Sequence, residues 1–163
     1  MKRLMVLVLS AAFVFALAPP ARAQVAAAVK PLATATTNWE GVSIDLMSVE
    51  RKGSILTVKW AVHNTGAKQS KVGFQLTGRD QTTYVLDEES GTKYYALTDK
   101  EKNTLASEHT YLGSDTYGIE DHIEPGATAR FWAKFPAPPA AVKAINVFFT
   151  KTEPFEGVAI TDK

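Results

Sequence analysis

Apolar and polar residues alternate along most of the chain after residue 39, and this period of two predicts β-strands. The clearest run lies at 55–63, where four apolar side chains share one face: Leu56, Val58, Trp60 and Val62. Such alternation is typical of an antiparallel strand that has one face on a core and the other toward solvent. We therefore expect these four side chains to be buried.

Further strand candidates follow at short and regular intervals along the sequence. They lie at 42–46, 72–77, 82–86, 93–97, 104–110, 128–135, 144–150 and 158–161. Turn residues separate them at 51–54, 64–66, 87–92 and 124–126, and the stretch 111–124 has the composition of an irregular loop. No stretch of twelve residues keeps a period of 3.6. The pattern predicts an all-β, immunoglobulin-like antiparallel β-sandwich of seven or eight strands, with a small barrel as the alternative.

The first 23 residues have a different pattern, in which Lys2 and Arg3 precede an apolar run. Pro19 and Pro20 end that run, and Ala21-Arg22-Ala23 forms a small-x-small cleavage site. This order is typical of a cleaved secretory signal peptide, so we expect an exported protein, periplasmic or extracellular. We interpret 24–38 as a flexible or loosely docked segment and 39–163 as the sandwich domain, and we expect no membrane span in the mature chain.

Composition and charge narrow the possible partners. The sequence has no cysteine, so disulfides do not contribute to the stability of this exported chain. Loss of the leader leaves 15 basic and 17 acidic residues, a net charge of −2, with no basic run. The electrostatic signature of a nucleic-acid-binding protein is therefore absent, and we expect no nucleic-acid partner.

Several short segments together resemble a known group of exported domains. They are Asn64-Thr65-Gly66, Tyr84-Val85-Leu86-Asp87, Ile123-Glu124-Pro125-Gly126 and, most specifically, Trp132-Ala133-Lys134-Phe135-Pro136-Ala137-Pro138-Pro139. Over 42–160 the chain resembles exported bacterial immunoglobulin-like domains of unknown function, of the DUF4352 type and the MPT63-like secreted type. The resemblance implies export and the sandwich fold. It implies no activity and no catalytic residues.

The three histidines are the basis of one functional alternative, a periplasmic protein that binds copper or zinc. Its ligands would be His63, His109, His122 and Asp121, brought together by the fold. The sequence has neither a His-x-His pair nor a methionine cluster that would fix such a site locally. It also has no Gly-x-Ser-x-Gly segment, so we expect no catalytic residues, no cofactor and no enzymatic activity.

Outward-facing aromatic residues support the preferred hypothesis of surface recognition. Trp132 is out of phase with the inward residues of its strand, and either Tyr94 or Tyr95 must point away from the core. Tyr111 and Tyr117 lie in the expected loop, and exposed Trp and Tyr residues often anchor interfaces. We therefore take Trp132, Tyr95, Tyr111 and Tyr117 as candidate binding residues. The expected partner is an unknown protein or a cell-envelope component, and the sequence leaves the oligomeric state open.

Overall fold

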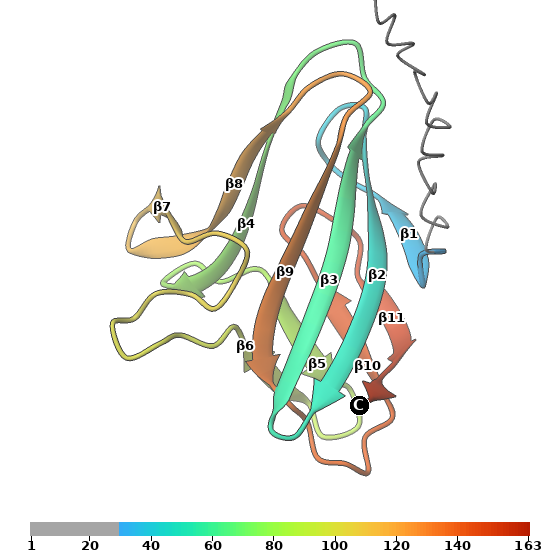
Figure 1. Cartoon of the computed structure of the whole chain (residues 1–163), viewed down its shortest axis with the longest axis vertical. Coiled ribbons are helices and arrows are strands. Elements are labelled where there is room, and N and C mark those ends of the chain that lie inside the picture. The colour runs from blue at the N-terminus through green and yellow to red at the C-terminus, as the bar shows by residue number, and fades with distance from the viewer. Residues whose placement is uncertain (1–29) are drawn as a thin grey trace, which may run out of the picture.

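The computed structural model describes residues 30–163, and all regular elements in this range are β-strands (Figure 1). The predicted leader 1–23 and residues 24–29 lie outside the described range. No helix long and apolar enough to cross a membrane is present in residues 30–163. The strands are β1 (Ala33–Thr36), β2 (Val42–Lys52), β3 (Ile55–Asn64), β4 (Ser70–Gly78), β5 (Tyr84–Asp87), β6 (Thr92–Tyr95), β7 (Thr110–Gly113), β8 (Thr116–Ile123), β9 (Thr128–Pro136), β10 (Ala144–Phe148), β11 (Phe155–Ala159) and β12 (Thr161–Asp162).

The strands form a sandwich of two layers. The first layer has the order β1-β2-β3-β9, and β12 pairs in parallel with the other end of β2. The second layer consists of the sheets β11-β10-β5-β6 and β4-β8-β7. These two sheets adjoin where the N–H groups of Thr82 and Thr83 donate to the carbonyl of Gln75. This arrangement confirms the predicted all-β, immunoglobulin-like antiparallel sandwich.

The core between the layers contains a cluster of aromatic rings around Trp60. The ring centroid of Trp60 lies 4.7 Å from that of Phe149, 5.2 Å from Phe74 and 5.9 Å from Phe131. Only 1% of Trp60 is exposed, and its indole Nε1 has no hydrogen-bond partner in the described residues. The four side chains predicted to face inward from 55–63 are all buried, which confirms the phase of that strand.

The structure contains more strands than the sequence pattern indicated, and three segments differ from expectation. Ala33–Thr36 was expected to be flexible or loosely docked, but it pairs with β2 along its whole length. The expected loop 111–124 instead contains most of the β7–β8 hairpin, whose strand β8 pairs with β4. The segment 104–110 was expected to be a strand, but it forms only isolated bridges before β7 begins. In the first two cases pairing with a neighbouring strand outweighs the weak local pattern, whereas 104–110 has no partner strand along its length.

Arg51 was expected in a turn, but it lies in β2 with only 5% of its surface exposed. Its Nε donates to Asp162 Oδ1 at 2.6 Å, and its Nη1 donates to the carbonyls of Pro139 at 2.8 Å and Val142 at 3.1 Å. The guanidinium group therefore ties both the 138–142 loop and the C-terminal strand β12 to β2. The hydrogen bond from Arg51 to its carboxylate is the main reason that the pKa of Asp162 is lowered below its usual value of 3.8.

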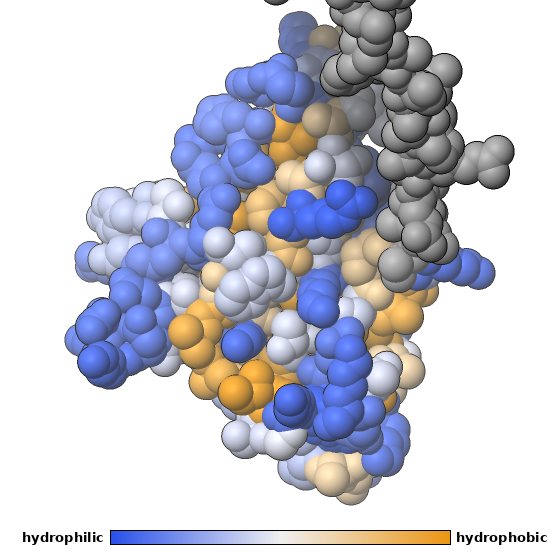
Figure 2. All heavy atoms as spheres, viewed as in Figure 1, coloured by the Kyte–Doolittle hydropathy of each residue, from blue (hydrophilic) through white to orange (hydrophobic). Residues whose placement is uncertain are grey.

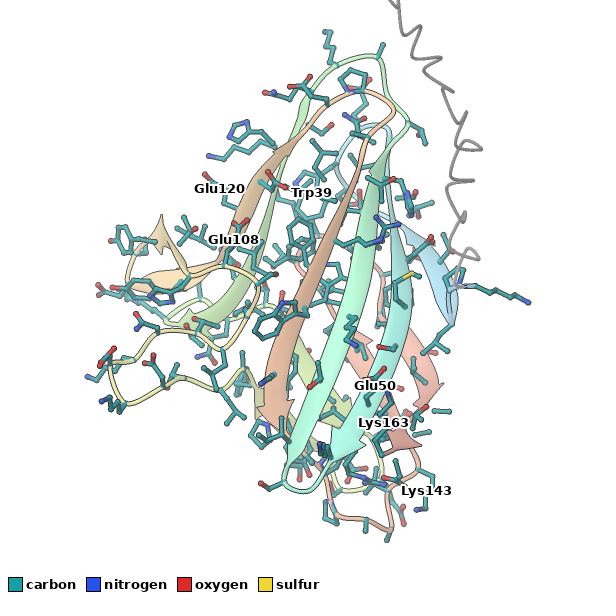
Figure 3. All side chains as sticks on the ribbon, in the orientation of Figure 1. Trp39, Glu50, Glu108, Glu120, Lys143 and Lys163 are labelled. Atoms are coloured by element: carbon teal, nitrogen blue, oxygen red, sulfur yellow. The ribbon has the colours of Figure 1, made fainter. Side chains whose placement is uncertain are left out.

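A second ion pair lies beside this cluster, at the same end of the first layer (Figure 3). The ammonium of Lys163 lies 2.9 Å from Glu50 Oε2. The hydrogen bond from Lys163 is the main reason that the pKa of Glu50 is lowered. Lys143 lies 3.5 Å from the second oxygen of Asp162, so the last two residues meet several charged groups of the sheet and of a neighbouring loop.

Candidate functional site

The four aromatic residues predicted to bind a partner do not form one surface. Trp132 lies on β9 of the first layer and is 37% exposed, whereas Tyr95 lies on β6 of the second layer and is 39% exposed. Tyr111 is 59% exposed on β7, and its ring centroid lies 5.3 Å from that of the half-buried Tyr117 on β8. Only these last two are brought together. Figure 2 shows apolar residues of one face in separate areas among polar ones.

Tyr95 belongs to an aromatic row across the second layer that the sequence analysis did not identify. The rings of Tyr84 and Phe148 are stacked with centroids 4.6 Å apart, and Tyr95 follows at 5.9 Å from Tyr84. Lys93 places its ammonium 4.6 Å from the Tyr84 centroid. Because Phe148 and Lys93 come from the strands on either side of β5, they cover both faces of the Tyr84 ring. The row therefore stabilises the sheet through cross-strand contacts.

His63 lies on the outer side of the first layer, within a polar row that crosses the strands. Its Nε2 lies 2.8 Å from Asp45 Oδ2, and its Nδ1 lies 2.8 Å from Thr128 Oγ1. Thr34 on β1 donates to the other oxygen of Asp45. The imidazole therefore links β2, β3 and β9, and both of its ring nitrogens have neighbours in the sheet.

The other two histidines lie on different segments. His109 Nδ1 accepts a hydrogen bond from the Thr104 N–H at 2.8 Å, and its ring stacks on Tyr117 with centroids 4.9 Å apart. His122 is exposed on β8, and its Nδ1 lies 3.3 Å from Gln69 Oε1. Asp121 accepts a hydrogen bond from the His122 backbone N–H. Within residues 30–163, no three His, Cys, Asp or Glu side chains are grouped so that they could hold a metal ion.

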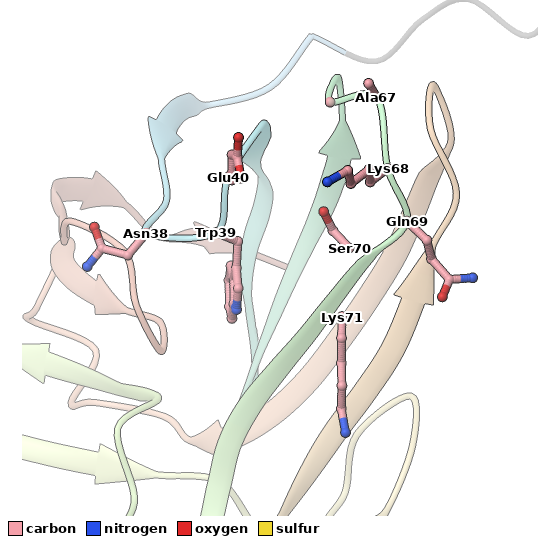
Figure 4. A pocket seen from close by; sticks show the side chains of 9 residues that line it. Asn38, Trp39, Glu40, Ala67, Lys68, Gln69, Ser70 and Lys71 are labelled. Atoms are coloured by element: carbon pink, nitrogen blue, oxygen red, sulfur yellow. The ribbon is translucent and has the colours of Figure 1, made fainter.

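A groove of about 390 Å³ lies at the opposite end of the first layer from Arg51 (Figure 4). The β1–β2 connection forms one wall, and the β3–β4 connection with the start of β4 forms the other. The indole of Trp39 is the large aromatic surface of the first wall. The groove is lined by Asn38, Trp39, Glu40, Gly66, Ala67, Lys68, Gln69, Ser70 and Lys71.

Local hydrogen bonds hold Trp39 in the first wall. The Trp39 N–H donates to Thr37 Oγ1 at 3.1 Å, and the Trp39 carbonyl accepts from the Val42 N–H at 3.2 Å. One side of the ring packs edge-on against the core residue Phe74, with centroids 5.7 Å apart. Trp39 is therefore anchored to the core and is half buried, and part of it lines the groove.

Two glycines bring the walls together at the base of the groove. Gly41 has a φ of +69°, and a Cβ atom at this position would lie 2.7 Å from the Cα of Gly66. The Thr65 N–H donates to the Gly41 carbonyl at 2.8 Å, which fixes one connection against the other. At position 41, only a glycine can combine this backbone conformation with such a close approach.

Asn64 organises the second wall from a position that is 1% exposed. Its Oδ1 accepts the Gly66 N–H at 2.9 Å, and its Nδ2 donates to the carbonyls of Lys68 at 2.7 Å and Ile123 at 2.8 Å. Both ends of the side-chain amide are thus used inside the protein. The Asn64 side chain sets the path of 64–68 and therefore the position of the lining residues.

The charged groups of the groove differ in how far they are neutralised. The Lys71 ammonium lies 2.9 Å from Glu120 Oε1. Neither Lys68 nor Glu40 takes part in an ion pair with another residue in the range 30–163. Lys151 approaches the Trp39 ring to within 6.0 Å of its centroid. The groove therefore offers an aromatic surface beside the hydroxyl of Ser70 and beside an ammonium and a carboxylate that have no ion pair among residues 30–163. The side-chain amide of Gln69 points away from Trp39 and is bonded to Glu124 and His122 instead (Figure 4).

This groove is not evident from the sequence because its lining lies outside the alternating segments. In the sequence pattern Trp39 marks only the start of the domain, and 64–66 indicates only a turn. The Asn-x-Gly order was nevertheless a usable signal, because an Asn side chain commonly bonds to the backbone two residues later.

The chain was also compared with known proteins. No protein-family model matches it, and searches of curated proteins and of solved structures find no match either.

Proposed function

We propose that this chain is a non-enzymatic recognition module of an exported protein, and that it binds a carbohydrate of the cell envelope in the groove beside Trp39. The observation that carries the proposal is the half-buried indole of Trp39 in the groove wall, next to Lys68 and Glu40, which have no ion pair among residues 30–163. The exported immunoglobulin-like domains that the sequence resembles are compatible with such a role.

The chemistry of the lining suits a sugar ring. A pyranose has an apolar face of C–H groups and a rim of hydroxyls that both donate and accept hydrogen bonds. An indole offers a large rigid surface against which the apolar face of the sugar can pack. Glu40, Lys68 and Ser70 provide acceptors and donors for the hydroxyl rim. A groove with a few placed polar groups orients its ligand through them.

The same lining argues for binding without hydrolysis. Most enzymes that cleave glycosidic bonds use a pair of carboxyl groups, one on each side of the bond. Among the residues of 30–163 that line this groove, Glu40 is the single carboxylate and none is a histidine. The row of Asp45, His63 and Thr128 contains a carboxylate, an imidazole and a hydroxyl, but it lies on the outer face of the sheet and links the strands there.

A titration followed by NMR tests the proposed binding. Chito-oligosaccharides and soluble peptidoglycan fragments are added to the ¹⁵N-labelled protein. We expect the Trp39 indole N–H and the amides of Lys68, Gln69 and Ser70 to shift, because these groups line the groove. Trp39→Ala should abolish the shifts at Lys68, Gln69 and Ser70, whereas Trp132→Ala, which removes an exposed indole elsewhere, should leave them intact. Shifts centred on Trp132, or none with either sugar, would show the proposal to be wrong.

We also infer that the leader directs export. Expression of the whole chain in a bacterium, followed by fractionation and mass spectrometry, should give a product that begins at Gln24 in the periplasm or the medium. An uncleaved chain in the cytoplasm would contradict this inference without affecting the binding test.

A further inference from the structure

The two outer edges of the first layer are covered to different extents. On the β2 side, β1 pairs with the first half of the strand and β12 with its last residues. On the β9 side, no strand of residues 30–163 adds to the sheet. A sheet edge that is left open presents backbone groups to which another extended chain can pair.

Part of the β9 edge is covered by an irregular segment. The Lys134 N–H donates to Leu105 O, and the Lys134 carbonyl accepts from the Leu97 N–H, both at 2.8 Å. The Trp132 carbonyl accepts from the Ser107 N–H at 2.9 Å. These bonds show that Trp132 and Lys134 direct their backbone groups away from β3.

The remainder of this edge is open. Since strand residues direct their backbone groups alternately to either side, Thr128 and Arg130 point theirs the same way as Trp132. In the described part of the chain, no other backbone group bonds to Thr128 or Arg130 on that side. Beside this edge, β8 and β9 diverge from their connecting turn into different sheets (Figure 1), so β8 does not cover it.

We propose that the first half of β9 is a site of strand addition, and that its occupant is an extended, acidic segment of a partner protein. A backbone edge is satisfied by another backbone, which is why an extended segment fits it. The side chains of such a segment would alternate between the two faces of the sheet. Those on the outer face would lie beside Arg130, which is exposed and has no ion pair among residues 30–163.

The other face of the added strand would meet apolar groups. Ala129 is half buried, and Phe131 belongs to the core between the layers. A segment that alternates acidic and apolar residues therefore matches both faces of this edge. This proposal concerns a protein partner on β9 and is independent of the proposed carbohydrate groove.

The test uses a blocked peptide of alternating Glu and Val residues. Amide hydrogen exchange of the purified protein is followed by NMR with and without the peptide. We expect the amides of Thr128 and Arg130 to exchange on the order of tenfold more slowly at saturation, because each gains a hydrogen bond. A Lys/Val peptide should bind about two- to fivefold more weakly, as expected for an exposed charge pair. Methylation of alternate peptide nitrogens, in the register that faces β9, should abolish the protection.

Two variants separate backbone pairing from charge. Arg130→Glu should reverse the preference between the Glu and Lys peptides and leave the fold intact. Arg130→Pro removes an N–H that is unpaired in the sheet, so the folded protein should keep its β3–β9 ladder and lose peptide binding. Protection away from β9, or binding that survives methylation in both registers, would overturn the proposal. So would protection of these amides without peptide together with dimers in sedimentation, since the occupant would then be a second copy.

Discussion

The two ends of the first layer use their polar groups in opposite ways. Around Arg51 the donors of the guanidinium are bonded to Asp162 and to loop carbonyls, so little hydrogen-bonding capacity is left for a ligand. Beside Trp39, the buried Asn64 is equally saturated, but Lys68 and Glu40 in front of it have no ion pair within the described range.

This difference separates a structural polar cluster from a candidate binding site. Burial alone does not distinguish them, because Arg51 and Asn64 are both buried. What distinguishes them is whether the saturated group supports further polar groups that remain exposed and unpaired. The Arg51 cluster joins chain segments to each other, whereas Asn64 holds a wall whose outer side faces a groove.

The largest effect is expected at the Arg51 end. Arg51→Met should lower the free energy of unfolding by about 3 kcal/mol, because buried carbonyls lose their donor and the C-terminal strand loses its attachment. Urea unfolding measures this change. Lys52→Met removes the same charge from the exposed neighbouring residue and should change stability by less than about 0.5 kcal/mol. Equal losses in the two variants would contradict the role given to the guanidinium.

Asn64 is expected to couple stability to the groove. Asn64→Ala should cost about 2 kcal/mol, because one buried N–H and two carbonyls lose their partner. The amide shifts of Lys68 to Lys71 should change at the same time. Thr65→Ala removes a single exposed hydrogen bond to Gly41 and should cost less than about 1 kcal/mol. If Asn64→Ala left the amide shifts of the groove unchanged, Asn64 would not position the groove wall as inferred.

The pH dependence of stability tests the Arg51 end independently. Because the pKa of Asp162 is lowered in the folded protein, the pair contributes stability above its usual value of 3.8. This contribution is lost as the pH falls through the lowered pKa. Melting temperatures of the wild type and Asp162→Asn should therefore differ at pH 6 and converge in strong acid. In an Arg51→Met background the same substitution should have little effect at any pH, as a double-mutant cycle would show.

The smallest effect on stability is expected at the lining of the groove. Lys68→Met should leave the urea midpoint within about 0.5 kcal/mol of the wild type, since the ammonium has no ion pair within residues 30–163. The same variant should weaken sugar binding in the NMR titration. A clear loss of stability would show that Lys68 supports the fold, as Arg51 does.

The sequence was sufficient for the fold where alternation was strong. The phase of β3 followed from Leu56, Val58 and Trp60, and the exposure of Trp132 followed from its neighbours in β9. Alternation failed for β8, where Asp121 interrupts the series of Tyr117, Ile119 and Ile123 and pairing with β4 supplies the order. It also failed for β1, a strand of small residues whose pairing with β2 is not visible in its own composition.

The candidate site depended on contacts that local sequence does not encode. Gly41 and Gly66 lie far apart along the chain, and no residue near either glycine indicates that the two backbones approach each other closely. The buried state of Arg51 likewise results from Asp162 and the 138–142 loop, both distant in sequence. The charged residues Arg51 and Lys52 next to Gly53 and Ser54 suggest an exposed turn. Only the tertiary structure reveals that the Arg51 side chain is buried.

The indole of Trp60, which has no hydrogen-bond partner among residues 30–163, gives the protein an internal optical reporter. A tryptophan shielded from water and without a hydrogen-bond acceptor emits at short wavelength, unlike the exposed Trp132. Because Trp60 contacts rings from both layers, its emission should shift to the red only when the layers separate. The protein's own fluorescence can therefore follow the opening of the sandwich without any added dye.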